Sequence, residues 1–216
     1  MRREPHVRFR EGPGVKFPRA TRLVLGFQYE DDARSLRRQL EDRLQRFHLE
    51  LHPEKTRLFR FGKNARRNQS ERGLRKPTSF EFLGFTHICG KSKAGGFVLT
   101  RHSSKHRMRA KLQTVKVALR RRMHLRVRDQ AVWLASVVRG FFAYHAVPTN
   151  IHALASFRVQ AVRHWIQALR RRGQRRRINW TQMRAIADRW LPRARILHPW
   201  PERRFDERTR GRSRVR

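Results

Sequence analysis

The stretch GFQYEDDAR contains three consecutive carboxylates, Glu30, Asp31 and Asp32, directly after Tyr29. Adjacent aspartates that project from a tight β-hairpin can hold the divalent ions that assist nucleotidyl transfer. That geometry needs apolar β-residues on both sides, but the following sequence, ARSLRRQLEDRLQRF, has helical periodicity. We therefore predict that Asp31 and Asp32 cap a helix and complement its dipole, and that they hold no metal ion.

Histidine and cysteine residues form two further candidate sites. His87 and Cys89 share one face of an expected strand, but no second pair at zinc spacing accompanies them, so a structural role is favoured. His102 and His106 lie four residues apart among lysines and arginines, which favours phosphate contact over metal binding. No Ser/His/Asp arrangement or Gly-rich phosphate loop occurs. The sequence therefore predicts no metal site and no cofactor.

The charge balance points to a polyanionic partner. The 216 residues include 54 lysines and arginines against 16 acidic residues, a formal net charge of +38. RNA is the first candidate and DNA the second, because arginine binds phosphate bidentately and stacks on bases. Membrane-surface binding competes, but no apolar run approaches the roughly 20 residues of a spanning helix and no signal peptide is visible. The single Cys89 excludes an intramolecular disulfide and suits a reducing cytoplasm, the compartment that we predict.

The first half of the chain has the pattern of a small α+β segment. Residues 1–21 are expected to form a poorly ordered basic arm, and residues 63–79 a basic loop. Within 22–100, apolar runs predict a strand at 22–28, a strand–turn–strand at 49–62 and a β-hairpin at 80–100. Leucines at helical spacing predict an amphipathic helix at about 31–47.

The second half of the chain, 101–191, is predicted to be all-helical. One helix carries an apolar stripe from Met108 to Met123, and three more are expected at about 128–145, 150–171 and 179–191, the last capped by Asn179 or Thr181. Aromatic residues on these stripes are predicted to lie in the core: Trp133, Phe141, Tyr144 and Trp165. Residues 192–216 are expected to form an extended, proline-rich and charged tail. The fold class is therefore α+β.

Basic residues beside the apolar stripes are the candidate RNA contacts. A helix that is apolar on one side and cationic on the other can pack on its own domain while it binds phosphates. The first-choice residues are Arg101, Lys105, Arg109, Lys111, Lys116 and Arg120. The second group comprises Arg139, Arg163, Arg170, Arg171 and Arg172.

Several motifs in a fixed order resemble the C-terminal part of a bacterial group II intron reverse transcriptase/maturase. They are LGFQYEDDA, LELHPEKTRL, FEFLGFTHICG, VVRGFFAYHAVPTN and LPRARILHPWPERRF, and the resemblance covers about residues 23–205. It implies the last strands and helix of a reverse-transcriptase palm, followed by a helical thumb that the family calls the maturase or X domain. In that family the thumb grips structured intron RNA.

The same resemblance implies that the catalytic aspartates are missing. The family's Tyr-Ala-Asp-Asp box lies just upstream of the LGFQ segment and uses Mg²⁺. In this sequence the matching positions are Arg19, Ala20, Thr21 and Arg22. Threonine is a poor substitute ligand and an arginine repels the ion. Tyr29 to Asp32 match the acidic cluster that opens the family's next helix.

We therefore expect a maturase-type protein that binds group II intron RNA and assists its folding and splicing, with no polymerase activity of its own. One alternative is a fragment of an RNA-directed DNA polymerase that needs separately encoded fingers and palm. Another is a non-functional remnant. Because residues 1–22 match nothing in the family, a truncated or frame-shifted gene is also expected.

Overall fold

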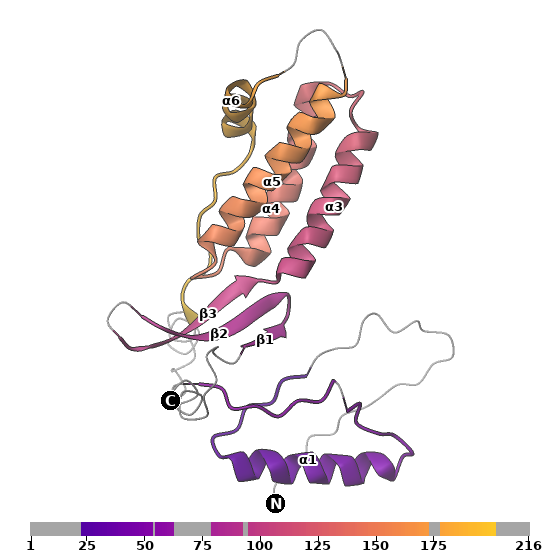
Figure 1. Cartoon of the computed structure of the whole chain (residues 1–216), viewed down its shortest axis with the longest axis vertical. Helices are drawn as coiled ribbons and strands as arrows, with labels where there is room; N and C mark the ends of the chain where they lie inside the picture. The colour runs from indigo at the N-terminus through magenta and orange to yellow at the C-terminus, as the bar shows by residue number, and fades with distance from the viewer. Residues whose placement is uncertain (1–22, 54, 63–78, 93–94, 173–177, 202–216) are drawn as a thin grey trace, which may run out of the picture.

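The computed structural model describes residues 23–53, 55–62, 79–92, 95–172 and 178–201, and within them the chain is mixed α+β (Figure 1). The helices are α1 (Glu30–Gln45), α3 (Lys105–Arg121), α4 (Val127–His145), α5 (Ile151–Arg170) and α6 (Trp180–Trp190). The strands are β1 (Ser79–Phe82), β2 (Phe85–Lys91) and β3 (Phe97–Ser103). The predicted basic arm 1–21, the predicted loop except its last residue, and the end of the tail after 201 lie outside the described residues.

The three strands form one antiparallel sheet in the order β1-β2-β3. The predicted hairpin over 80–100 is confirmed for β2 and β3, which pair antiparallel. The prediction that its first strand is continuous is wrong, because a two-residue turn at Leu83 and Gly84 divides that strand into β1 and β2. Both residues have positive φ, 47° and 82°, which matches the twist of a tight hairpin. Phe82 consequently pairs with Phe85, and β3 continues to Ser103.

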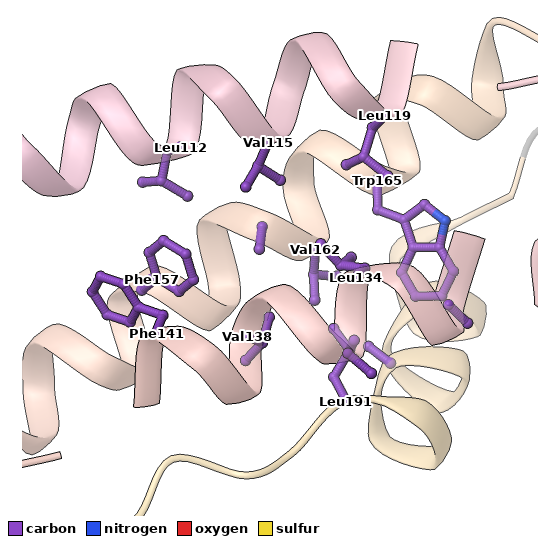
Figure 2. Close-up of a cluster of buried hydrophobic side chains, with 14 of the residues drawn as sticks. Leu112, Val115, Leu119, Leu134, Val138, Phe141, Phe157, Val162, Trp165 and Leu191 are labelled. Carbon is purple, nitrogen blue, oxygen red and sulfur yellow. The ribbon is translucent and has the colours of Figure 1, made fainter. Parts of the chain in front are cut away.

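The predicted helices of the second half are confirmed within a few residues at each end. Their apolar stripes meet in one core, in which Leu119, Leu134, Phe157 and Trp165 are fully buried (Figure 2). Helix α5 lies centrally and packs against α3, α4 and α6. Burial of these stripes, rather than helix propensity, is what stabilises such a bundle.

A buried amide fixes the register of two helices. Gln130 on α4 is fully buried, and its Oε1 accepts a hydrogen bond of 3.0 Å from the indole Nε1 of Trp165 on α5. Its Nε2 donates to the carbonyls of Met123 and Leu125 in the α3–α4 loop. Both polar atoms of the Gln130 side chain have hydrogen-bond partners. Its burial therefore does not incur the free-energy cost of an unsatisfied buried amide.

A second polar network joins the sheet to the bundle. Asn150, fully buried between α4 and α5, accepts from the Ser103 amide at 2.9 Å and donates to the Ser103 hydroxyl and the His145 carbonyl. Beside it, the Thr149 hydroxyl accepts from the Arg101 amide at 2.9 Å and donates to the Arg101 carbonyl at 3.3 Å. The α4–α5 loop therefore takes the place of a further strand along part of β3.

Replacing Asn150 with alanine is expected to lower the free energy of unfolding by about 2 kcal/mol, since an unpaired buried polar group costs about 1–3 kcal/mol. The change leaves the Ser103 amide and the His145 carbonyl without their Asn150 partner. Urea unfolding of the full chain measures this. Ser136→Ala on the exposed side of α4 is the control, expected within about 0.5 kcal/mol of the parent. Equal losses in both variants would show that the network is not stabilising.

The strands predicted in the first half are not formed. Residues 23–28 and the described part of 49–62 contain no strand, because no described segment pairs with them along a ladder. An unpaired strand leaves its amides and carbonyls without partners. The predicted turn in 49–62 is confirmed, since the His52 carbonyl accepts from the amides of Lys55 and Thr56. The predicted helix 31–47 is confirmed as α1, which lies apart from the bundle in Figure 1.

The end of the described chain returns to the bundle. Asn179 caps α6 as predicted, in a capping box with Gln182. Residues 192–200 have no regular structure, and the amides of Leu197 and His198 both donate to the Ala146 carbonyl at the end of α4. This contact holds the tail segment against the bundle end that faces the sheet.

Candidate nucleic-acid interface

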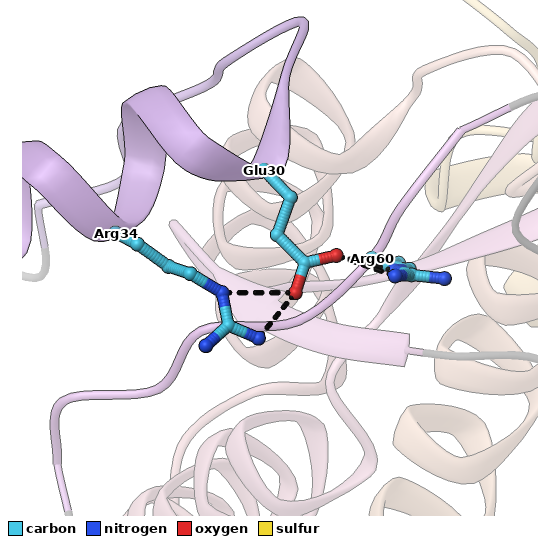
Figure 3. A network of polar contacts seen from close by, with 3 residues as sticks. All are labelled: Glu30, Arg34 and Arg60. Carbon is cyan, nitrogen blue, oxygen red and sulfur yellow. Dashed lines mark hydrogen bonds and ion pairs between the residues drawn. The ribbon is translucent and has the colours of Figure 1, made fainter.

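Glu30, the first of the three consecutive carboxylates, forms ion pairs with two arginines (Figure 3). Glu30 is the first residue of α1, and its two oxygens accept from the guanidinium groups of Arg34 and Arg60, with the shortest distances 2.6 Å in each pair. These hydrogen bonds, the one from Arg34 first, lower the pKa of Glu30. Glu30 therefore holds the start of α1 against the segment that contains Arg60.

The position of Asp31 and Asp32 corrects the capping prediction. The N-cap of α1 is Tyr29, whose side chain makes no capping bond, and the two aspartates lie inside the first turn. Their charges still meet the positive end of the helix dipole. The residues that follow form a helix and not the second strand of a hairpin, so the arrangement that would present both carboxylates to one ion is absent from this described segment.

Four of the six first-choice candidates for RNA contact lie on one face of α3. Lys105, Arg109, Lys116 and Arg120 are all exposed and follow each other at spacings of four, seven and four residues. Such spacings place them on one side of the helix, beside the buried stripe of Leu112, Val115 and Leu119. We call these four residues the α3 ridge. At about 1.5 Å per residue the ridge is roughly 22 Å long.

The other two first-choice residues lie elsewhere. Lys111 is exposed, but its position two residues after Arg109 places it on the opposite flank of α3. Arg101 is half-buried on β3, paired in register with His87. Its backbone is bound to Thr149, and burial lowers the pKa of its guanidinium. Arg101 is therefore part of the sheet rather than of the ridge.

The second group of predicted contacts is divided among other surfaces. Arg139 is exposed on α4, and Arg163 and Arg170 lie seven residues apart on the outer side of α5. The guanidinium of Arg170 donates to the Ile178 carbonyl, and that of Arg172 donates to the Leu125 carbonyl at 2.8 Å. These two arginines connect chain segments at the end of α5, so the structure gives them a role in the fold that spacing did not reveal.

Carboxylates are scarce around these cations. Residues 101–201 contain only two acidic side chains, Asp129 and Asp188, among a large excess of lysine and arginine. Asp188 pairs with Arg158, which also donates to the carbonyls of Ala187 and Pro192 and so joins α5 to α6. Of the ion pairs formed between described residues, none includes any of the eleven predicted RNA contacts. The positive charge of the bundle is thus mostly uncompensated within it.

The candidate metal ligands are not assembled into a site. Cys89 is buried and its sulfur accepts from the Gly62 amide at 3.3 Å, while burial raises the pKa of its thiol. His87 stacks on Phe80, and His102 and His106 are exposed on β3 and α3. Over the described ranges, no group of three or more His, Cys, Asp or Glu side chains could hold a metal ion.

The aromatic residues divide into core and surface. Trp165 and Phe141 are buried as predicted, and Trp133 is half-buried at the edge of the core with the Arg122 guanidinium 4.6 Å from its ring centre. The core prediction is wrong for Tyr144, which is 51% exposed. Its hydroxyl donates to the Leu83 carbonyl and its ring stacks on Phe85, because it bridges the bundle to the β1–β2 turn.

His145 makes the junction between sheet and bundle sensitive to pH. Its ring stacks on Phe141 and its Nδ1 lies 3.0 Å from the Ser103 hydroxyl. Burial, with a smaller effect of the Arg107 charge, lowers the pKa of His145 from 6.5 to about 4. The folded state therefore holds a neutral imidazole at pH values where the unfolded chain already binds the proton.

The sign of this shift predicts that stability is lost as pH falls from about 6.5 towards 4, because the unfolded state gains the proton first. Urea unfolding at pH 7 and pH 5 measures the loss. The variant His145→Gln should be less pH-dependent than the parent over this range, with some dependence left because burial also lowers the pKa of His87. An unchanged pH dependence in the variant would contradict the assignment to His145.

Comparison of the chain with models of protein families, with curated proteins and with solved structures found no match. Within the described residues, none of the helices combines the length and apolar character needed to cross a membrane.

Proposed function

We propose that this chain is an RNA-binding protein that contacts the phosphate backbone with its helical bundle. The observation that carries the proposal is the α3 ridge, a row of four exposed cations that pair with no described carboxylate, on a bundle with two acidic residues. Cations that are buried or ion-paired would indicate a structural role. The four ridge side chains are exposed, so they can neutralise phosphates and release the counterions bound there.

Within RNA-binding proteins, we propose the maturase type associated with group II introns. The supporting observations are the ordered sequence motifs and a small α+β segment followed by a helical bundle, which is the order expected of a palm end and a thumb. A protein of this kind acts without covalent chemistry. It binds the folded intron more tightly than unfolded forms and so shifts the RNA towards its splicing-competent state.

The proposal includes no polymerase activity for the chain alone. The positions that match the family's metal-binding aspartates are Thr21 and Arg22, which lie outside the described residues. Asp31 and Asp32, the nearest adjacent pair, lie in the first turn of α1. With the chain as the only protein, primer extension is expected to stay at background and to be unaffected by Asp31→Ala plus Asp32→Ala.

Splicing of a group II intron RNA tests this function. At a magnesium concentration where the RNA alone splices poorly, stoichiometric protein is expected to raise the splicing rate at least several-fold. A variant with glutamine at the four ridge positions should lose most of this effect. An unchanged splicing rate with bound parent protein, or the absence of intron RNA domains around the gene, would contradict the maturase proposal.

A second candidate is a polymerase fragment completed by separately encoded fingers and palm. The specific observation in its favour is the poor burial of the segment before the sheet, where α1 buries only Ala33. Large apolar side chains are exposed there, among them Leu23, Leu25, Phe27, Phe47 and Leu49. Such surfaces commonly mark contacts with another protein. Primer extension that appears only when both fragments are mixed would support this candidate.

A further inference from the structure

Two arginine runs that are distant in sequence end at the same end of the bundle. Helices α3 and α5 both run away from the sheet, and Figure 1 shows their last turns together at the end opposite the strands. They carry Arg120–Arg122 and Arg170–Arg172 there. The α3–α4 loop and the start of α4 add Arg126 and Arg128. Three chain segments thus bring cations to one end of the molecule.

Some of these arginines hold the end of the bundle together. Arg172 donates to the Leu125 carbonyl, which also accepts from Gln130, so the end of α5 is tied to the α3–α4 loop. Arg122 donates to the Ala118 carbonyl and stacks on Trp133. Arg170 donates to the Ile178 carbonyl. The guanidinium groups of Arg122, Arg170 and Arg172 are therefore fixed by hydrogen bonds to carbonyls and, for Arg122, by the Trp133 ring.

The other arginines have no such contact among the described residues. We call Arg121, Arg126, Arg128 and Arg171 the bundle tip; all four are exposed and outside the ion pairs of the described chain. Arg121 and Arg171 lie at helix C-terminal ends, where a cation is favourable to the dipole. Arg126 and Arg128 lie at the N-terminal end of α4, where a cation is unfavourable. Helix stability therefore does not explain the second pair.

We propose that the bundle tip is a second RNA-contact site that recognises a point where backbone strands converge, such as a junction or a tight turn. This inference rests on the proposed RNA-binding function and extends it from affinity to the choice of RNA shape. The α3 ridge is linear and suits a phosphate row. At the tip, guanidinium groups from three chain segments lie at one end of the bundle. Where RNA strands converge, their phosphates are closely spaced and can accept hydrogen bonds from such a cluster.

Equilibrium binding of the full chain to two RNAs tests the proposal: a three-way junction and a straight duplex with the same number of phosphates. The tip variant replaces Arg121, Arg126, Arg128 and Arg171 with glutamine. The matched control replaces Lys105, Arg109, Lys111 and Lys116 on α3, which removes the same charge and leaves the tip end of the helix unchanged. The tip variant is expected to lower the ratio of junction to duplex affinity on the order of tenfold, while the α3 control lowers both affinities by a similar factor.

A tip variant that leaves the affinity ratio unchanged would overturn the proposal even if the protein still binds RNA. Failure of the RNA-binding function itself is distinguishable, because then the parent chain would bind both RNAs no more tightly than heparin. The double variant Arg126→Gln plus Arg128→Gln separates binding from folding. It is expected to keep or slightly raise the midpoint of thermal unfolding while it lowers the ratio, and a lowered midpoint with an unchanged ratio would assign both arginines to the fold.

Discussion

Glutamine at Lys105, Arg109, Lys116 and Arg120 together is expected to weaken RNA binding on the order of 10²–10³-fold at about 0.1 M salt. Each phosphate contact contributes about 0.7–0.9 to the slope of log affinity against log salt, so four lost contacts should make that slope about three units shallower. Glutamine keeps much of the side-chain length and a good helix propensity, so α3 should form normally. Binding isotherms of parent and variant over a salt series measure both quantities.

The control for this prediction removes the same charge from another surface. Arg184, Arg189, Arg193 and Arg195 are exposed on α6 and just after it, and their replacement by glutamine leaves the ridge intact. Equal losses in the two variants would show that RNA responds only to total charge. A loss confined to the ridge variant assigns the contacts to α3.

Trp165→Ala should remove about 3–5 kcal/mol from the free energy of unfolding, the usual cost of truncating a buried tryptophan. Its side chain is fully buried in the hydrophobic core of the bundle (Figure 2). The substitution also deprives the buried Oε1 of Gln130 of its indole donor. For a domain with typical stability of about 5–15 kcal/mol, this is enough to unfold a large fraction of the protein on warming.

Urea or thermal unfolding of the full chain checks the Trp165 prediction. Trp180→Ala is the comparison, because Trp180 is 42% exposed at the start of α6 and its loss should cost far less. Comparable destabilisation by the two substitutions would mean that the burial of Trp165 contributes little to the free energy of unfolding. Gln130→Leu in the Trp165→Ala background removes the unpaired Oε1 but also the donor to the Met123 and Leu125 carbonyls, so it should recover only part of the loss.

The helical half of the fold could be predicted from the sequence because its apolar period is unbroken. Leu112, Val115 and Leu119 recur at helical spacing and all three are buried. The cap at Asn179 was visible as well, since it precedes an apolar run and has Gln182 three residues later. In these segments local pattern and tertiary packing favour the same structure.

The first half could not be predicted equally well because strands depend on partners that are distant in sequence. The apolar run at 23–28 has the composition of a strand, yet Leu23 is 75% exposed and no described strand pairs with it. The turn at Leu83 was missed because leucine rarely adopts positive φ, so only Gly84 offered a signal. Tyr144 continued the apolar stripe of α4, but it lies where that helix meets the sheet.

The candidate site was predictable where it follows helical spacing and unpredictable where it depends on topology. The α3 ridge could be identified from the positions of Lys105 and Arg109 relative to the apolar stripe. The structural role of Arg172 could not, because its carbonyl partner Leu125 is 47 residues away. The bundle tip was missed for the same reason: its cations meet only because α3 and α5 end together.

The most direct test of the central claim is equilibrium binding of the full chain to a group II intron RNA and to a random RNA of equal length, at salt concentrations between about 50 and 200 mM. We predict tighter binding to the intron throughout, with a preference that persists at the highest salt because folded RNA presents phosphates in a fixed arrangement. Equal affinity for both RNAs at every salt concentration, matched by heparin, would contradict the account and leave only non-specific attraction between charges.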